Sequence, residues 1–100
     1  MNIQALMTQV NKMKKEISKK QSELETKTYE GSASNALVIV KLKGDYTLEE
    51  ITIAKELEGD NEMIQDLLVI AYNDAKSKLE KDKEETLGKL TGGMSIPGLF

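Results

Sequence analysis

Five lysines near the N-terminus are the residues of this chain whose type and spacing best suit a chemical role. Lys12, Lys15 and Lys19 recur at i, i+3 and i+7, which places them on one face of a helix. The first 22 residues hold five lysines and a single glutamate, whereas the whole chain has a net charge of −3. A local positive field of this kind can steer an anionic partner toward an acidic protein. We refer to Lys12, Lys14, Lys15, Lys19 and Lys20 as the N-terminal lysines.

The absence of arginine limits the nucleic-acid contacts that this chain can make. All 14 basic residues are lysine, so the guanidinium group that most often reads guanine is missing. Three tyrosines and one phenylalanine are too few for a base-stacking platform. Lysines contact phosphates as point charges and carry little sequence information. The residues therefore predict weak, salt-sensitive binding to the backbone of duplex DNA. The simpler interpretation is that the N-terminal lysines form only the solvated outer face of a coiled coil.

The composition gives no support for an enzyme. The chain has neither cysteine nor histidine, the usual residues of zinc sites and general-base catalysis. The acidic residues between Glu49 and Glu62 lack the spacing of a calcium loop, which favours a solvated acidic face. Gly92-Gly93 follows a predicted helix rather than a strand, unlike a phosphate-binding loop. We expect no catalytic residue, no metal, no cofactor and no small-molecule substrate.

No stretch of the sequence suits a membrane. Apolar runs such as Ala36–Val40 are far shorter than the roughly 20 residues of a membrane-spanning helix. Polar residues interrupt the N-terminal apolar positions, so a secretory signal is not expected. These features predict a cytoplasmic protein.

A heptad pattern predicts a long first helix over residues 2–24. Its apolar residues recur at the spacing of a coiled-coil seam, which requires a partner helix from this chain or another. Lys20 stands where a further core residue would fall, which predicts that the packing opens there. The seam comprises Ile3, Leu6, Val10, Met13, Ile17 and Leu24.

Three β-prone runs follow and predict an antiparallel meander. The first ends at Gly31, the second is Ala36–Lys43, and the third is Tyr46–Ile53. The second run is apolar on both faces at its start, which is typical of a central strand covered on both sides. Gly44-Asp45 suits a two-residue hairpin turn. The alternation of the third run places four residues on one face: Thr47, Glu49, Ile51 and Ile53.

An acidic loop over Lys55–Glu62 leads into a second long helix over Asn61–Leu90, with Asp60 or Asn61 as its N-cap. Within Leu67–Ala75 the apolar residues cover most of the circumference, so this part must be covered on several sides. Asn73 and Asp74 are expected to be half-buried and hydrogen-bonded. Three i,i+4 ion pairs are predicted further along: Lys76 with Glu80, Lys78 with Asp82, and Lys81 with Glu85.

The predicted fold is thus α/β (α+β): a helix, three strands and a helix in one domain over residues 1–91, with a flexible Gly-rich tail over 92–100. Two such long helices extend far beyond a three-stranded sheet and would leave apolar surface exposed in a monomer. We therefore expect a homodimer with projecting helices. The predicted dimer interface is the central strand, at Leu37, Val38, Ile39 and Val40.

The run Ala71-Tyr72-Asn73-Asp74-Ala75 resembles the Ala-x-Asn-Asp-Ala signature of the YbaB/EbfC family of bacterial nucleoid-associated proteins. The family commonly has Asp-Pro after the third strand, where this chain has Ala54-Lys55. Otherwise the likeness runs along almost the whole chain. It includes Gly31, Gly44, Ile51, Ile53, Leu57, Thr91-Gly92-Gly93-Met94 and Pro97-Gly98.

The resemblance implies an α/β homodimer that binds DNA with little sequence preference, as a nucleoid-associated factor in the bacterial cytoplasm. It also supplies a reason for a one-signed lysine stripe on the first helix. A different class remains open: a protein-interaction adaptor or holdase whose projecting helices grip polypeptide, in a prefoldin-like layout. Binding to random duplex DNA and binding to unfolded protein discriminate between the two.

Overall fold

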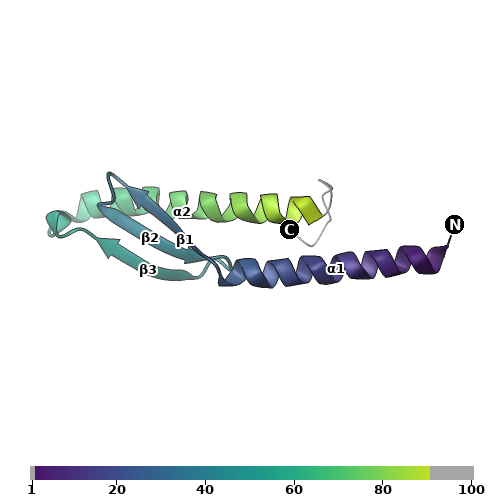
Figure 1. The fold of residues 1–100 in the computed structure, drawn as a ribbon. Helices are drawn as coiled ribbons and strands as arrows, with labels where there is room; N and C mark the ends of the chain where they lie inside the picture. The colour runs from purple at the N-terminus through teal and green to yellow at the C-terminus, as the bar shows by residue number, and fades with distance from the viewer. Residues whose placement is uncertain (1, 91–100) are drawn as a thin grey trace.

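A computed structural model describes residues 2–90 of the chain; the predicted tail at 92–100 lies outside them. The chain forms a long helix, a three-stranded sheet and a second long helix, as predicted; the second helix lies along the sheet and the first extends away from its end (Figure 1). The molecule measures 68 × 19 × 19 Å, and its radius of gyration is 18.7 Å, against about 13 Å for a compact domain of this length. The elements are α1 (Ile3–Thr26), β1 (Thr28–Ala33), β2 (Val38–Lys43), β3 (Leu48–Ile53), the 3₁₀ turn η1 (Lys55–Leu57) and α2 (Asn61–Leu90).

Helix α1 begins one residue after its N-cap and ends two residues later than predicted. The Asn2 side chain accepts hydrogen bonds from the backbone N–H groups of Gln4 and Ala5, at 3.1 and 3.4 Å. At the other end, the last turn lies against the loop between β2 and β3. A Cβ added to Gly44 would come within 1.8 Å of the Leu24 carbonyl oxygen, so only glycine fits there.

The sheet is an antiparallel meander in the order β1-β2-β3, as predicted. Strand β1 continues beyond the predicted end at Gly31, through Ser32 and Ala33. The turn instead begins at Ser34, and three consecutive residues, Ser34, Asn35 and Ala36, have a left-handed backbone with φ of 47, 55 and 67°. Of these three residue types, Asn tolerates this conformation best. The other two give little sign of a left-handed turn, so the residue types did not locate it.

The hairpin between β2 and β3 differs from the predicted two-residue turn. Its loop has three residues, since the backbone N–H of Lys43 donates to the Thr47 carbonyl at 2.8 Å. The left-handed position falls on Tyr46, with φ of 70°, and not on Gly44. Gly44 is required by its close approach to α1, which explains why a glycine in this loop does not mark the expected turn type.

A register shift in β3 also corrects the predicted strand face. Lys41 pairs with Glu50 but Leu42 pairs with Leu48, so Glu49 is an extra residue in the ladder. Such a bulge reverses the alternation of side chains beyond it. Leu48 therefore joins Ile51 and Ile53 on the face that carries the core residues of β2, where Thr47 and Glu49 had been expected.

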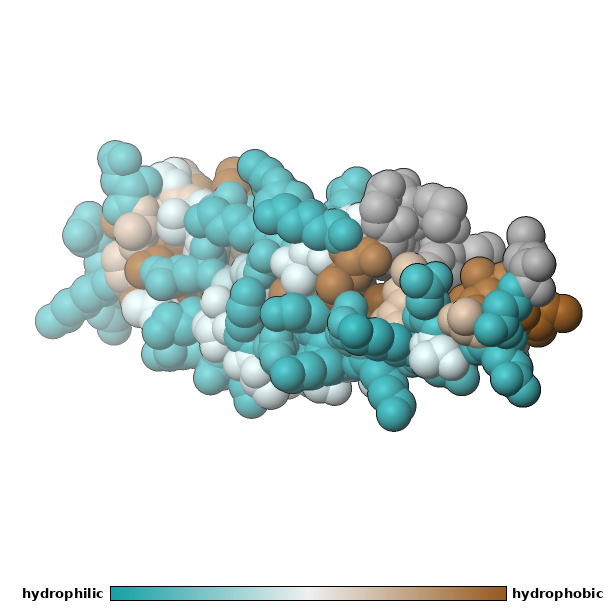
Figure 2. All heavy atoms as spheres, turned by 45° about the vertical axis from the view of Figure 1, so that its right-hand side comes forward, coloured by the Kyte–Doolittle hydropathy of each residue, from teal (hydrophilic) through white to brown (hydrophobic). Residues whose placement is uncertain are grey.

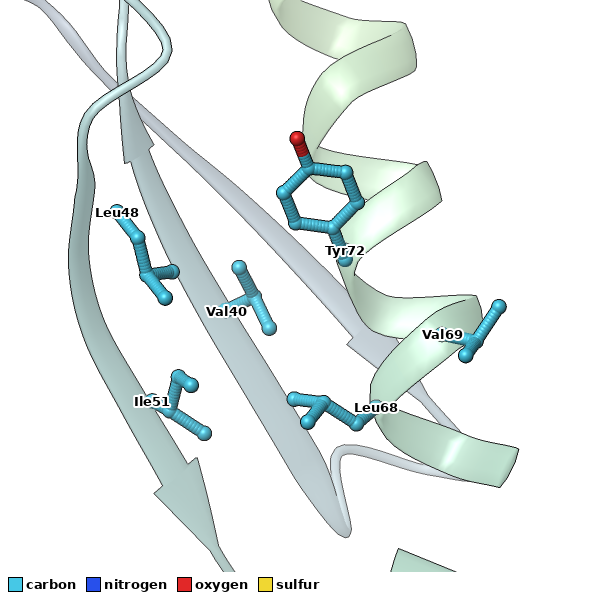
Figure 3. Close-up of a pocket in the computed structure, with 6 residues that line it drawn as sticks. All are labelled: Val40, Leu48, Ile51, Leu68, Val69 and Tyr72. Atoms are coloured by element: carbon cyan, nitrogen blue, oxygen red, sulfur yellow. The ribbon is translucent and has the colours of Figure 1, made fainter. Parts of the chain in front are cut away.

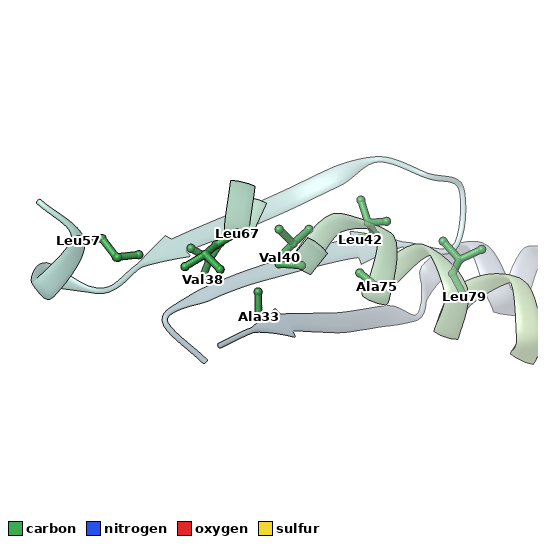
Figure 4. Packing of buried hydrophobic residues seen from close by; sticks show 9 residues of the cluster. Ala33, Val38, Val40, Leu42, Leu57, Leu67, Ala75 and Leu79 are labelled. Atoms are coloured by element: carbon green, nitrogen blue, oxygen red, sulfur yellow. The ribbon is translucent and has the colours of Figure 1, made fainter. Parts of the chain in front are cut away.

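The core lies between α2 and one face of the sheet (Figure 4). The side chains of Val38, Val40 and Leu42 are fully buried there. Each such side chain contributes about 1.5–3 kcal/mol by leaving water. The opposite face of β2 carries half-exposed Ile39 and Lys41, so the described part of the chain covers this strand on one side only. The remaining members of the cluster are Ala33, Leu57, Leu67, Ala71, Ala75 and Leu79.

The Ala-x-Asn-Asp-Ala run docks α2 onto β1. A Cβ on Gly31 would lie 2.2 Å from the Ala71 carbonyl oxygen and 2.2 Å from the Ala75 nitrogen, so the two backbones are in direct contact. The Asp74 carboxylate accepts a hydrogen bond from the Ser32 N–H at 3.0 Å, and this bond holds the pKa of Asp74 below its ordinary value. The prediction of a half-buried, hydrogen-bonded side chain is confirmed for Asp74 and is wrong for Asn73, which is exposed.

A second polar contact joins β1 to α2 near the start of β1. The Tyr29 hydroxyl donates to Asp82 at 2.6 Å, and Lys27 Nζ lies 3.3 Å from the same carboxylate. Thr86 donates to its other oxygen at 3.2 Å. The hydrogen bond from Tyr29 lowers the pKa of Asp82, while burial and the neighbouring carboxylate raise the pKa of Tyr29.

We predict that Gly31→Ala lowers the free energy of unfolding by about 3 kcal/mol or abolishes folding, because the new methyl group would force the β1 and α2 backbones apart. Gly88→Ala is the matched control: no described atom lies within 4 Å of its added Cβ. This control should gain up to about 1 kcal/mol of helix propensity. Urea unfolding followed by circular dichroism measures both, and equal midpoints for Gly31→Ala and wild type would contradict the docking role.

We predict that acid sensitivity depends on Asp82. Its folded-state pKa lies below the ordinary value of 3.8, so its stabilising contribution is present above that value and is lost as the pH falls through the folded pKa. Asp82→Asn should therefore be less stable than wild type at pH 7, and the difference should shrink between about pH 5 and pH 2. Urea midpoints across this range test it. Asp66→Asn, at an exposed site on α2, is the control; a constant Asp82→Asn deficit at every pH would refute the prediction.

Candidate nucleic-acid interface and an uncovered apolar groove

The N-terminal lysines lie on the part of α1 that runs beside the end of α2, since Ile17 among them is buried against Leu87. All five are exposed. Lys20 pairs with Glu23 at 3.3 Å. Within residues 2–90, no acidic side chain forms an ion pair with the other four, which are Lys12, Lys14, Lys15 and Lys19. The structure thus brings four uncompensated cations together along one helix.

The lysines of α2 are in a different situation. Lys76 pairs with Glu80 at 3.9 Å, as predicted. Lys78 does not pair with Asp82; it lies 3.4 Å from Asp74 and donates to the Glu30 carbonyl at 2.9 Å. The physical reason is that the Asp82 side chain points toward β1. Its carboxylate there binds the Tyr29 hydroxyl and the Lys27 ammonium group. The predicted pair between Lys81 and Glu85 is not formed among the described residues.

The seam of α1 is covered over its inner half only. Ile17 and Leu24 are buried against Leu87 of α2, with Met13 and Leu90 packed beside them. The partner helix required by the heptad pattern is therefore α2 of the same chain. The predicted opening at Lys20 is wrong, because buried seam residues stand on both sides of it. The seam opens further toward the N-terminus, where four residues are exposed: Ile3, Leu6, Met7 and Val10. We call these four the outer seam.

An apolar groove runs between β3 and α2 (Figure 3). It exists because α2 lies across β1 and β2 and makes hardly any contact with β3. Its volume is about 270 Å³. Ile53, which shares this face of β3 with Ile51, is also exposed, at 43%. The groove is lined by Val40, Leu48, Ile51, Leu68, Val69 and Tyr72, with no charged side chain among them.

The sequence carries one signal for this groove but does not locate it. The stretch Leu67–Ala75 is apolar nearly all round and must be covered on several sides. The sheet covers one side, and Val69 on another side remains 60% exposed. The accessible surface of the chain, 7272 Å², also exceeds the roughly 5,700 Å² of a compact monomer of this mass.

The four residues predicted for a dimer interface have different environments in the structure. Val38 and Val40 are enclosed by α2 of their own chain, and Val40 also lines the groove. Leu37 and Ile39 are half-buried. Their role in a dimer stays a prediction.

The described residues hold no group of three or more histidine, cysteine or acidic side chains placed to bind a metal ion. Among these residues there is also no helix that is long and apolar enough to cross a membrane. The candidate site consists of a charged helix face and an apolar groove.

These features define a class of protein, a small α+β domain with a projecting helix that bears lysines. Comparison with known proteins gives the family. Residues 1–94 match the model of the YbaB/EbfC DNA-binding family, and the chain belongs to this family. This is a family of nucleoid-associated DNA-binding proteins and not of enzymes.

Relatives from several bacteria support the assignment. A nucleoid-associated protein of Ligilactobacillus salivarius is 42% identical over 99% of this chain and 95% of its own length. One from Enterococcus faecalis is 44% identical over 93% of this chain and 91% of that protein. The fold is similar to the crystal structure of an uncharacterized protein from Helicobacter pylori, with a TM-score of 0.79 over 92% of this chain and 99% of that one, at 24% identity.

The one departure from the family pattern that the sequence showed lies at Ala54-Lys55. Here the chain forms the turn η1, in which the Leu57 N–H donates to the Ala54 carbonyl at 3.0 Å. The Leu57 side chain is buried in the core. Asp60 then caps α2 by accepting from the Met63 N–H at 3.2 Å, as one of the two predicted caps. The connection is therefore regular without the Asp-Pro pair.

Proposed function

We propose that this protein binds duplex DNA with little sequence preference, as a nucleoid-associated factor in the bacterial cytoplasm, and that the N-terminal lysines contact the phosphates. The observation that supports this most directly is the set of four exposed lysines on α1 without an ion pair in the described chain. Family membership supports DNA as the partner. An effect on nucleoid organisation or gene expression would follow from such binding.

The geometry suits contact with a phosphate backbone. Lys12 and Lys19 are seven residues apart, or about 10 Å along the helix, a length that can follow a run of phosphates. The exposed ammonium groups can reach a duplex without displacing a protein partner. Without arginine and with few aromatic residues, the contacts convey charge and little sequence information.

We further propose that the protein acts as a homodimer and that the groove between β3 and α2 receives a second copy. A contiguous apolar surface of this kind usually marks an interface. A second copy presents the same surface, so two self-complementary faces can cover each other about a twofold axis. Dimerisation would bring two sets of N-terminal lysines together and double the number of phosphates that one assembly can contact.

We predict that the triple variant Lys12→Glu, Lys15→Glu, Lys19→Glu folds but loses DNA binding for all sequences alike, because phosphate contacts are removed and base contacts are not. For wild type, six engaged lysines per dimer would give a slope of log affinity against log salt of about −5. Filter-binding titrations at several salt concentrations measure affinity and slope, with circular dichroism as the check on folding.

The matched control is Lys55→Glu, Lys76→Glu, Lys81→Glu, which changes the net charge by the same amount at sites outside α1. It should bind much more tightly than the α1 variant. If both triple variants bind equally, the effect is one of overall charge and the assignment to α1 fails. A parallel assay with an unfolded protein tests the holdase alternative, which requires binding that survives the α1 substitutions.

We predict that Ile51→Asp converts the dimer into a folded monomer. Ile51 is 40% exposed in the single chain, so the chain can still fold, but a dimer would bury the new carboxylate without a partner. The dimer dissociation constant should rise 100-fold or more, equivalent to about 2.8 kcal/mol. Thr52→Asp, on the other face of β3, should leave assembly unchanged. Sedimentation of a wild-type monomer at micromolar concentration would refute the dimer.

A further inference from the structure

The outer seam has no role in the proposed function. Its exposed fractions run from 40% for Val10 to 70% for Ile3, and it continues the line of Ile17 and Leu24 that α2 covers. Residues 1–11 carry no charged side chain, so this end of α1 is not a phosphate-binding surface. Figure 2 shows brown, hydrophobic side chains gathered at the same end of the molecule. An exposed apolar stripe on a projecting helix usually marks a surface that another segment or protein binds.

Helix α2 covers the inner part of the seam, and it ends where the exposed outer seam begins. Leu90, the last residue of α2, and Met13 both pack against the cluster of Ile17, Leu24 and Leu87, and Met13 is the next seam position inward from Val10. Helix α2 runs antiparallel to α1 here, toward the N-terminus of α1 (Figure 1). A chain that continues beyond Leu90 therefore starts at the border of the outer seam.

We propose that residues 91–100 of the same chain bind along the outer seam as a strap. From Val10 to Ile3 is about 10 Å along the helix, and ten residues can span up to roughly 33 Å. The segment has no charged side chain and can present Met94, Ile96, Leu99 and Phe100 to the seam.

Two other occupants fit less well. The groove is a poor site for the strap, because Leu90 and Val69 are 21 residues apart on α2, or about 32 Å, which only a fully extended segment would span. A second copy, also in the proposed dimer, would have to bring its own segment to this seam, whereas the segment of the same chain begins at the border of the seam. The attached segment has an effective concentration in the millimolar range and competes successfully with it.

The experiment uses Phe100→Trp in the full chain, which has no other tryptophan. On the outer seam the indole should emit at shorter wavelength than free tryptophan and be protected several-fold from acrylamide quenching. Both properties should persist on dilution to concentrations at which sedimentation shows a monomer, because the contact is within one chain. An indole as exposed as free tryptophan overturns the proposal, and a shift that disappears on dilution assigns the segment to a second copy and also overturns it.

The location is tested by adding Leu6→Glu to the reporter chain. Leu6 lies in the outer seam and outside the core, so circular dichroism should be unchanged while the blue shift and the protection are lost. Thr8→Glu adds the same charge on the face of α1 away from the outer seam and should leave both intact. If Leu6→Glu keeps the shift, the segment binds elsewhere and the proposal is wrong. DNA binding enters neither readout, so the outcome is independent of the proposed function.

Discussion

The direct contact between the backbones of β1 and α2 is the constraint on which the rest of this structure depends. It requires Gly31 on the strand and small residues, Ala71 and Ala75, on the helix. The hydrogen bond from Ser32 to Asp74 fixes the rotation and register of the helix at the same point. With α2 held so close to β1, a single helix covers β1 and β2 and leaves β3 uncovered. The groove is therefore a consequence of the same contact that forms the core.

The order of the elements could be predicted because each one carries a strong local pattern. The heptad repeat gave α1, the alternation and turn residues gave the meander, and the long uninterrupted run gave α2. The Asp60 cap and the Lys76–Glu80 pair were also predictable, since both depend on residues close together in the sequence. Family resemblance reinforced these predictions without being needed for them.

The errors came from contacts between residues far apart in the sequence. Gly44 looked like a turn residue because turn chemistry is local, but its role is to let the hairpin approach α1. Asp82 looked like the partner of Lys78, but it binds Tyr29 of β1 and Lys27, the residue that precedes this strand. The bulge at Glu49 changed which side chains of β3 face the groove. None of these contacts has a signature within a single element, so the groove could not be located from the sequence.

An acidic protein can still present a cationic surface because most of its acids are engaged by other groups or lie far from that surface. Asp74, Glu80 and Asp82 are each engaged by a nearby donor, whereas the N-terminal lysines have few acids near them. The unpaired acids around η1 and the start of α2 lie toward the other end of a molecule 68 Å long. At physiological salt, charge interactions fade over about 8 Å, so these acids contribute little to the field at α1. The net charge of −3 is thus a property of the whole chain that a duplex held against α1 would hardly sense. The acids at the other end would instead repel the DNA there and so favour the orientation in which α1 meets the DNA.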